Sequence, residues 1–230
     1  MKVLELFSGT QSISKEFRKR GHKTLTLDNN KIFKENTDLC MDVLDLTSDM
    51  VIDKLGDPDI IWASPPCTAF SVASISHHWE GGYKAYKPKT EFAKLSQEIV
   101  KHTLKLINEL NPKFYFIENP RGILRKMPFM QKYPRFTVTY CQYGDSRMKP
   151  TDIWTNHPYP QFKPTCSNGD DCHESAPRGS RTGTQGLKNA RERAKIPKEL
   201  CEHIVNISEM SYKEAEEKYY DENIVQESLF

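Results

Sequence analysis

Short apolar runs alternate along the chain with stretches in which apolar residues recur at helical spacing. The apolar runs, each closed by a turn signal, predict strands at 2–7, 24–27, 59–63, 114–117, 136–141 and 153–154. The helical spacing predicts one helix ending at Gly21 and others at 50–55 and 91–110. We expect Val43 and Leu44 to form a further strand. Strands that alternate with helices predict an α/β fold with a doubly wound, mostly parallel sheet.

Residues 157–189 break this pattern. They are rich in Pro, Gly, Ser and Asp and show almost no periodicity, which predicts a long irregular insertion. A terminal helix is expected from Ile196-Pro197 to about Met210. We therefore divide the chain into a core at 1–156, an irregular insertion at 157–189 and a helical segment at 190–230 that packs back on the core.

Composition excludes few functions. The 230 residues are 37% hydrophobic and 28% charged, as in ordinary globular proteins, and the net charge of +2 gives no overall field for a polyanion. Basic residues gather at 84–94 and 178–198, which would suit phosphate contacts or a solvated face. No run approaches the roughly 20 apolar residues of a membrane span, and no signal segment is seen. A cytoplasmic protein with reduced cysteines is expected.

The loop after the first predicted strand is a candidate ligand site. Gly9 allows close approach of the backbone, and Asp28, at the end of the next strand, could accept ribose hydroxyls. A single glycine in this place is equally typical of a plain strand-to-helix turn.

Two later strand ends carry groups suited to covalent chemistry on a pyrimidine. Pro65-Pro66 stiffen a loop that presents Cys67, although an isolated cysteine is more often a small buried residue. Glu118 could bind a ring nitrogen and an exocyclic amine together, which activates cytosine toward a thiolate; a helix cap or an ion pair is the alternative. Arg147 and Lys149 could hold the base's carbonyl oxygen, or be surface cations.

Taken together and in this order, Leu4–Gly9, Pro65-Pro66-Cys67 with Phe70-Ser71, and Glu118-Asn119 resemble the motifs of the DNA cytosine-5 methyltransferase family. The resemblance implies a Rossmann-like S-adenosylmethionine-dependent fold. It implies that Cys67 is the nucleophile, that Glu118 binds N3 and the amino group of cytosine, and that Arg147 and Lys149 complete the catalytic set. It also implies a cofactor site lined by Phe7, Ser8, Gly9, Thr10, Asp28, Asn29, Asp42 and Pro65.

The chain departs from the family pattern at several positions. Pro120 replaces an aliphatic residue, Lys149 stands in place of the second arginine of an Arg-x-Arg pair, and Asp145 replaces a glutamine. Lysine cannot form a bidentate fork, so a weaker grip on the base is expected. The recognition domain of the family is reduced here to about 157–189, which implies low sequence selectivity.

The irregular insertion holds a candidate metal site. Cys166, Cys172 and His173, with His157 and Cys141 upstream, offer thiolate and imidazole ligands that suit a structural zinc, although ordinary unliganded cysteines are the alternative. The basic stretch 178–183 could clamp phosphates or be a flexible loop.

The resemblance implies a DNA methyltransferase of phage or restriction-modification type, with DNA as its partner. Two alternatives stay open. One is a non-catalytic DNA-binding or regulatory protein that keeps the fold, and the other is a cytosine-5 methyltransferase that acts on RNA or nucleotides.

Overall fold

A six-stranded sheet forms the centre of the molecule. The computed structural model describes residues 1–81, 86–174, 192, 195–210 and 214. The strand order is β2-β1-β3-β6-β8-β7, and β8 is antiparallel to both of its neighbours while the other pairs are parallel. The strands are β1 (Lys2–Leu6), β2 (Lys23–Leu27), β3 (Ile60–Ala63), β6 (Phe114–Pro120), β7 (Arg135–Thr139) and β8 (Pro150–Thr155). The predicted mostly parallel sheet is confirmed.

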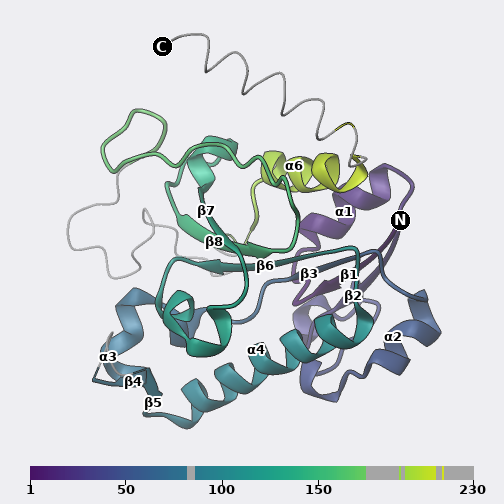
Figure 1. The fold of residues 1–230 in the computed structure, drawn as a ribbon, viewed down its shortest axis with the longest axis horizontal. Helices are drawn as coiled ribbons and strands as arrows, with labels where there is room; N and C mark the ends of the chain where they lie inside the picture. The colour runs from purple at the N-terminus through teal and green to yellow at the C-terminus, as the bar shows by residue number, and fades with distance from the viewer. Residues whose placement is uncertain (82–85, 175–191, 193–194, 211–213, 215–230) are drawn as a thin grey trace.

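Helices cover both faces of this sheet (Figure 1). On one face, α1 (Ser12–Lys19) and α6 (Lys198–Glu209) share an apolar cluster that includes Phe17 and Ile204. On the other face, α2 (Ser48–Leu55) and α4 (Glu91–Leu110) bury Val51 and Leu104. The prediction of a doubly wound α/β fold is therefore confirmed.

Local sequence sets the ends of the helices. Thr47 Oγ1 accepts a hydrogen bond from the Met50 amide at the start of α2, and Thr90 Oγ1 accepts one from Ala93 at the start of α4. Asn111 ends α4 in a left-handed conformation with φ of 43°. The predicted helix at 91–110 is confirmed.

Two predicted strands differ from the structure. Val43 and Leu44 lie in a 3-10 helix, Val43–Asp45, because the Asp42 carboxylate accepts a hydrogen bond from the Leu44 amide at 3.0 Å. A single parallel bridge from Leu27 to Leu39 extends the sheet beyond β2. The strand predicted at 136–141 ends at Thr139, and Tyr140–Tyr143 turns into a 3-10 helix.

The parallel registers bring three loops to one edge of the sheet. Leu6 pairs with Ala63, and Ala63 pairs with Ile117. The loops that follow β1 and β3, and the last residues of β6, therefore leave the sheet side by side. This is the edge at which doubly wound folds bind their ligands.

Residues 157–174 contain no helix or strand. The basic stretch 178–183 lies outside the residues that the structure describes, as does most of the segment 190–230 apart from α6. A search of the described helices finds none with the length and apolar character of a membrane span.

Candidate active site

The loop after β1 has a strained backbone that is fixed by Asp28. Phe7, Gly9 and Gln11 have φ of 59°, 47° and 57°, and such conformations cluster at ligand sites. The Gly9 amide donates to Asp28 Oδ2 at 2.8 Å, and the Ser8 amide donates to a β2 carbonyl. Asp28 therefore holds the loop, and its carboxylate keeps lone pairs for a ligand.

Two orphaned atoms fit a bound cofactor at this edge. Ser8 Oγ and Asn119 Oδ1 are buried and have no hydrogen-bond partner among the described residues. A methyl group on Gly9 would lie 4.0 Å from both Asp28 Oδ2 and the Phe33 ring, so the glycine faces these two side chains. The loop and the end of β2 thus offer polar atoms that a nucleoside-containing cofactor could satisfy.

The remaining predicted cofactor residues lie near the ends of the strands or in the turns that follow them. Thr10 follows Gly9, and Asn29 is exposed beyond Asp28. Asp42 is half-buried and caps the 3-10 helix. Pro65 is buried in the loop after β3, and its carbonyl accepts a hydrogen bond from Asn119 Nδ2 at 3.0 Å.

Cys67 lies in a loop that is held by contacts with β6 and with the turn that follows it. Besides the bond from Asn119, a close approach occurs between Gly122 and the Phe70 carbonyl. A Cβ atom on Gly122 would lie 2.2 Å from Phe70 O, so the position has no room for a side chain. On the loop's far side, Trp79 Nε1 donates to the Ala69 carbonyl at 2.7 Å. The cysteine is half-buried on a fixed scaffold.

Glu118 is buried in β6 and receives a hydrogen bond from Tyr140. The Tyr140 hydroxyl donates to Glu118 Oε1 at 2.9 Å, and both side chains are almost fully buried. Burial, followed by the nearby Glu118 carboxyl, raises the pKa of Tyr140 well above its ordinary value. Tyr140 therefore stays a neutral donor and orients the carboxyl group.

Lys149 connects the thiol and the carboxyl electrostatically. Its Nζ lies 4.4 Å from the centre of the Tyr140 ring, and its backbone has a left-handed φ of 27°. Burial lowers the pKa of Lys149, and the nearby Glu118 and Cys67 oppose that shift. Groups from three separate segments thus share one electrostatic environment.

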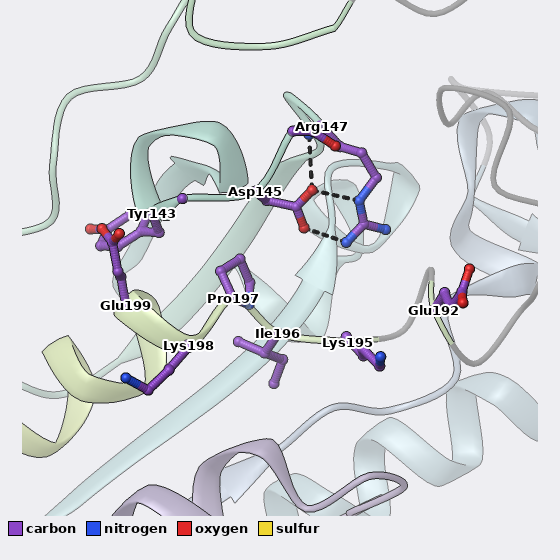
Figure 2. A pocket seen from close by; sticks show the side chains of 11 residues that line it. Tyr143, Asp145, Arg147, Glu192, Lys195, Ile196, Pro197, Lys198 and Glu199 are labelled. Carbon is purple, nitrogen blue, oxygen red and sulfur yellow. Dashed lines mark hydrogen bonds and ion pairs between the residues drawn. The ribbon is translucent and has the colours of Figure 1, made fainter.

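Arg147 forms an ion pair with Asp145, two residues before it in the sequence. Its Nε donates to Asp145 Oδ1 at 2.8 Å and its Nη2 donates to Oδ2, as Figure 2 shows. Burial raises the pKa of Asp145, but the hydrogen bonds from Arg147 outweigh it and hold that pKa below its ordinary value. The two hydrogen bonds to Asp145 therefore fix the orientation of the Arg147 guanidinium group.

The Arg147–Asp145 pair forms one wall of a cavity of about 600 Å³. The opposite wall is the chain that enters α6, including Ile196 and Pro197 (Figure 2). Arg20 on the loop after α1 is ion-paired with Glu209 at 2.6 Å, so α6 is fastened beside α1, the helix that follows the loop after β1.

A profile of C-5 cytosine-specific DNA methylases matches residues 1–130 of the chain. A "Probable DNA (cytosine-5)-methyltransferase" of Frog virus 3 (isolate Goorha) is 32% identical over 177 residues, covering 75% of this chain and 78% of the viral protein. The chain belongs to the C-5 cytosine-specific DNA methylase family.

Solved structures are more distant from this methylase family member. An E. coli protein encoded within a prophage and assigned as a DNA modification methyltransferase is 17% identical, with a TM-score of 0.49, and the match covers 67% of this chain and 46% of the other. For Spodoptera frugiperda DNMT2 the identity is 16%, the TM-score 0.46 and the coverage 76% and 57%. The chain spans about half the length of these solved proteins.

Several residues of this cytosine methylase site were not predicted from the sequence. Tyr140 lacks a local signal, because its partner Glu118 is 22 residues away. The Arg125–Asp152 ion pair fixes the turn after β6, and the Thr137 hydroxyl donates a hydrogen bond to the same aspartate. This pair was not predicted either. Gly122 could have been considered from the sequence, because glycine is the residue that allows a close approach of the backbone.

The structure brings four of the five predicted metal ligands together and places the fifth elsewhere. Cys141, Cys166, Cys172 and His173 come together, with one ligand atom from each within 4.8 Å of the others. His157 lies elsewhere, buried against the Phe114 ring, and its Nε2 is 3.0 Å from the Ile207 carbonyl. The suggestion that His157 contributes to this site was wrong.

Proposed function

We propose that this chain transfers a methyl group from S-adenosylmethionine to C5 of cytosine in DNA. The observation that carries the proposal is the hydrogen bond from Asn119, next to Glu118, to the Pro65 carbonyl in the Cys67 loop, which joins these two segments beside the loop after β1. Membership of the C-5 cytosine-specific DNA methylase family supports the same reaction.

The cofactor would supply an electrophilic methyl group. Phe7, Ser8, Gly9 and Thr10 would line its site. The Ser8 hydroxyl would gain a hydrogen-bond partner, Asp28 and Asn29 would hold the ribose, and Asp42 would hold the adenine. The buried Pro65, held by Asn119, would close the side nearest the thiol.

The protein's own groups perform the remaining steps. The Cys67 thiolate adds to C6 of cytosine, which makes C5 nucleophilic. The Glu118 carboxyl group donates a proton to N3 and accepts a hydrogen bond from the exocyclic amine, which neutralises the negative charge that develops on the ring. Lys149 and Arg147 stabilise the carbonyl oxygen. After C5 gains the methyl group, a water molecule takes up the C5 proton, the C5–C6 double bond forms again, and the C6–sulfur bond breaks to release the Cys67 thiolate.

The target base must leave the duplex to reach this site. Cys67 is only half-exposed and Glu118 is buried, so a stacked cytosine cannot contact both. Extrusion of the base costs a few kcal/mol, which contacts to the DNA backbone must offset. Residues 157–189 and the basic stretches beside them are the part of the chain that we assign to these contacts.

The reaction is tested with radiolabelled S-adenosylmethionine and mixed-sequence duplex DNA. The native chain and Cys40→Ser should both label 5-methylcytosine in digested DNA, whereas Cys67→Ser should give no label above background. With S-adenosylmethionine present, a duplex that contains 5-fluorocytosine should trap the native chain covalently, because fluorine stands in place of the C5 proton that must leave.

Other outcomes would replace the proposal. Bound S-adenosylmethionine without label or trapping would indicate a non-catalytic protein that keeps the fold. Label in RNA or free nucleotides, but not in DNA, would assign the chain to another cytosine substrate.

A further inference from the structure

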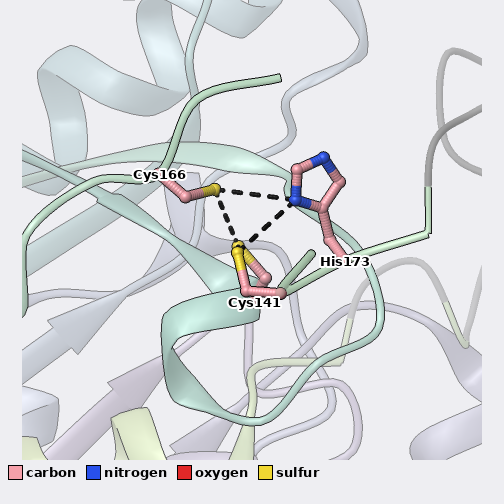
Figure 3. Close-up of side chains that lie close together, drawn as sticks. Cys141, Cys166 and His173 are labelled. Atoms are coloured by element: carbon pink, nitrogen blue, oxygen red, sulfur yellow. Dashed lines mark hydrogen bonds between the residues drawn. The ribbon is translucent and has the colours of Figure 1, made fainter. Parts of the chain in front are cut away.

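Four metal-binding side chains meet at the end of β7. Cys141 comes from the 3-10 helix that follows this strand, and Cys166, Cys172 and His173 come from the irregular segment after β8. Figure 3 shows the Cys166 thiol and the His173 ring directed toward Cys141. The segment after β8 thus contacts the 3-10 helix after β7 at the place where the three sulfur atoms and the imidazole nitrogen lie close together.

The distances within the cluster suit a tetrahedral ion. Cys172 Sγ lies 3.7 Å from Cys141 Sγ and 3.6 Å from His173 Nδ1, and Cys166 Sγ lies 3.8 Å from His173 Nδ1. Zinc bonds of about 2.3 Å to sulfur and about 2.0 Å to nitrogen place tetrahedral ligands at about 3.8 Å for two sulfurs and about 3.6 Å for sulfur and nitrogen. Three of the gaps therefore match zinc coordination.

Of the six pairs among the four ligand atoms, the Cys141–Cys166 pair argues against a disulfide. Their Sγ atoms are 3.0 Å apart, well beyond the roughly 2.05 Å of a sulfur–sulfur bond, and would move apart to about 3.8 Å on binding zinc. The thiols also have outer contacts of the kind that orient metal ligands. Gln142 Nε2 lies 3.6 Å from Cys172 Sγ, and the Cys166 amide donates to Thr139 Oγ1 at 3.1 Å.

The segment that carries three of these ligands has little else to hold it. Residues 163–174 are mostly exposed and form no helix or strand. A segment without a core of its own is the kind that a metal orders. We propose that Cys141, Cys166, Cys172 and His173 bind one Zn²⁺ ion that fastens residues 163–174 to the end of β7.

The proposed ion would lie close to the catalytic groups without touching them. Cys141 directly follows Tyr140, the donor to Glu118, and the Glu174 amide donates to the Ser146 carbonyl, next to Arg147, at 2.8 Å. Zinc bound here would hold both neighbours in place. Its role is structural, because all four positions are filled by protein ligands.

Metal content of the purified chain tests the site directly. Elemental analysis should find about one zinc per native chain and per Cys40→Ser chain, and at least a fivefold lower content for Cys166→Ser and Cys172→Ser. His173→Ala should also lose zinc, whereas His173→Cys should retain it, because four thiolates form an equally good site. Retention by the conservative variant would separate coordination from a general loss of folding.

Cobalt substitution of the native chain keeps the test valid even if the serine variants do not fold. After chelation, added Co²⁺ should give the absorption bands of a tetrahedral thiolate complex, and Zn²⁺ should displace it. Absence of zinc together with absence of these bands would overturn the proposal, as would a Cys141–Cys166 disulfide in the native chain. Both readouts are independent of methyl transfer, so failure of the proposed function would not affect them.

Discussion

Tyr140 determines how Glu118 can meet a base. Its hydroxyl donates to one carboxylate oxygen at 2.9 Å inside a buried site, which fixes the plane of the carboxyl group. The same ring supports the Lys149 ammonium on its face. A single side chain therefore positions the two groups that the proposed mechanism places against the base.

Removal of the Tyr140 hydroxyl should reduce catalysis without unfolding the chain. A hydrogen bond to a charged group contributes about 1.5–3 kcal/mol, so Tyr140→Phe should lower kcat/KM for DNA methylation by about 10- to 100-fold. Tyr143→Phe is the matched control, because the Tyr143 hydroxyl accepts a hydrogen bond from the Lys163 amide away from Glu118. Equal losses in both variants would show that Tyr140 has no positioning role.

Gly122 should not tolerate a side chain. Gly122→Ala places a methyl group 2.2 Å from the Phe70 carbonyl, so the loop that holds Cys67 must shift. We expect covalent trapping by 5-fluorocytosine DNA to slow by at least about tenfold, as misplacement of a reacting group predicts. Arg121→Ala, at the exposed neighbouring position, should trap at the native rate. Native trapping by Gly122→Ala would contradict the close approach.

At the scale of elements, a buried carboxyl joins β1 to α1. Glu5 is 2% exposed and accepts a hydrogen bond from the Ser14 amide at 2.9 Å, near the start of the helix. Burial raises the pKa of Glu5 from 4.5 to about 7, and the hydrogen bonds only partly offset this. The junction of the first strand and helix is thus sensitive to pH.

The pH dependence has a definite sign. Between pH 4.5 and about 7 the folded chain holds a proton on Glu5 that the unfolded chain has released, so stability falls as pH rises through this window. The loss is on the order of 2–3 kcal/mol for a shift of this size. Urea unfolding at pH 5 and pH 8 should therefore show a smaller decrease for Glu5→Gln than for the native chain. Equal decreases would contradict the raised pKa.

Most elements could be predicted because their causes are local. The helix at 91–110 begins at a threonine cap and ends at Asn111, and both signals are visible in the sequence. Val43 and Leu44 were mispredicted because two apolar residues fit a strand equally well, and the Asp42 cap decided otherwise. Elements of two or three residues depend on such single contacts.

The site could be predicted only where a motif carries the chemistry. Cys67, Glu118 and Lys149 stand out by residue type and place, and the structure brings them together. Tyr140 and the Asp145 partner of Arg147 could not be assigned roles, because a hydroxyl across the sheet and a choice of ion pair depend on the folded geometry. The sequence alone therefore does not show which polar groups become partners in the folded chain.

At the scale of the whole molecule, we expect the short recognition region assigned to about residues 157–189 to limit selectivity. Each good bidentate contact to a base edge contributes about 1–3 kcal/mol of discrimination, so few contacts distinguish few bases. Bisulfite sequencing of plasmid DNA methylated to partial completion should show rates that differ by less than about 100-fold among cytosine contexts. A single strict site of four or more bases would contradict this expectation.

The contacts of Asn119 and Gly122 with the Cys67 loop restrict which substitutions the molecule can accept. The bond from Asn119 to Pro65 spans 54 residues of sequence, and Gly122 meets the Phe70 carbonyl across a similar interval. A substitution on one side of this contact is harmful until the other side compensates. A change in one of the two motifs is therefore expected to require a compensating change in the other, so that the two motifs vary as a single unit.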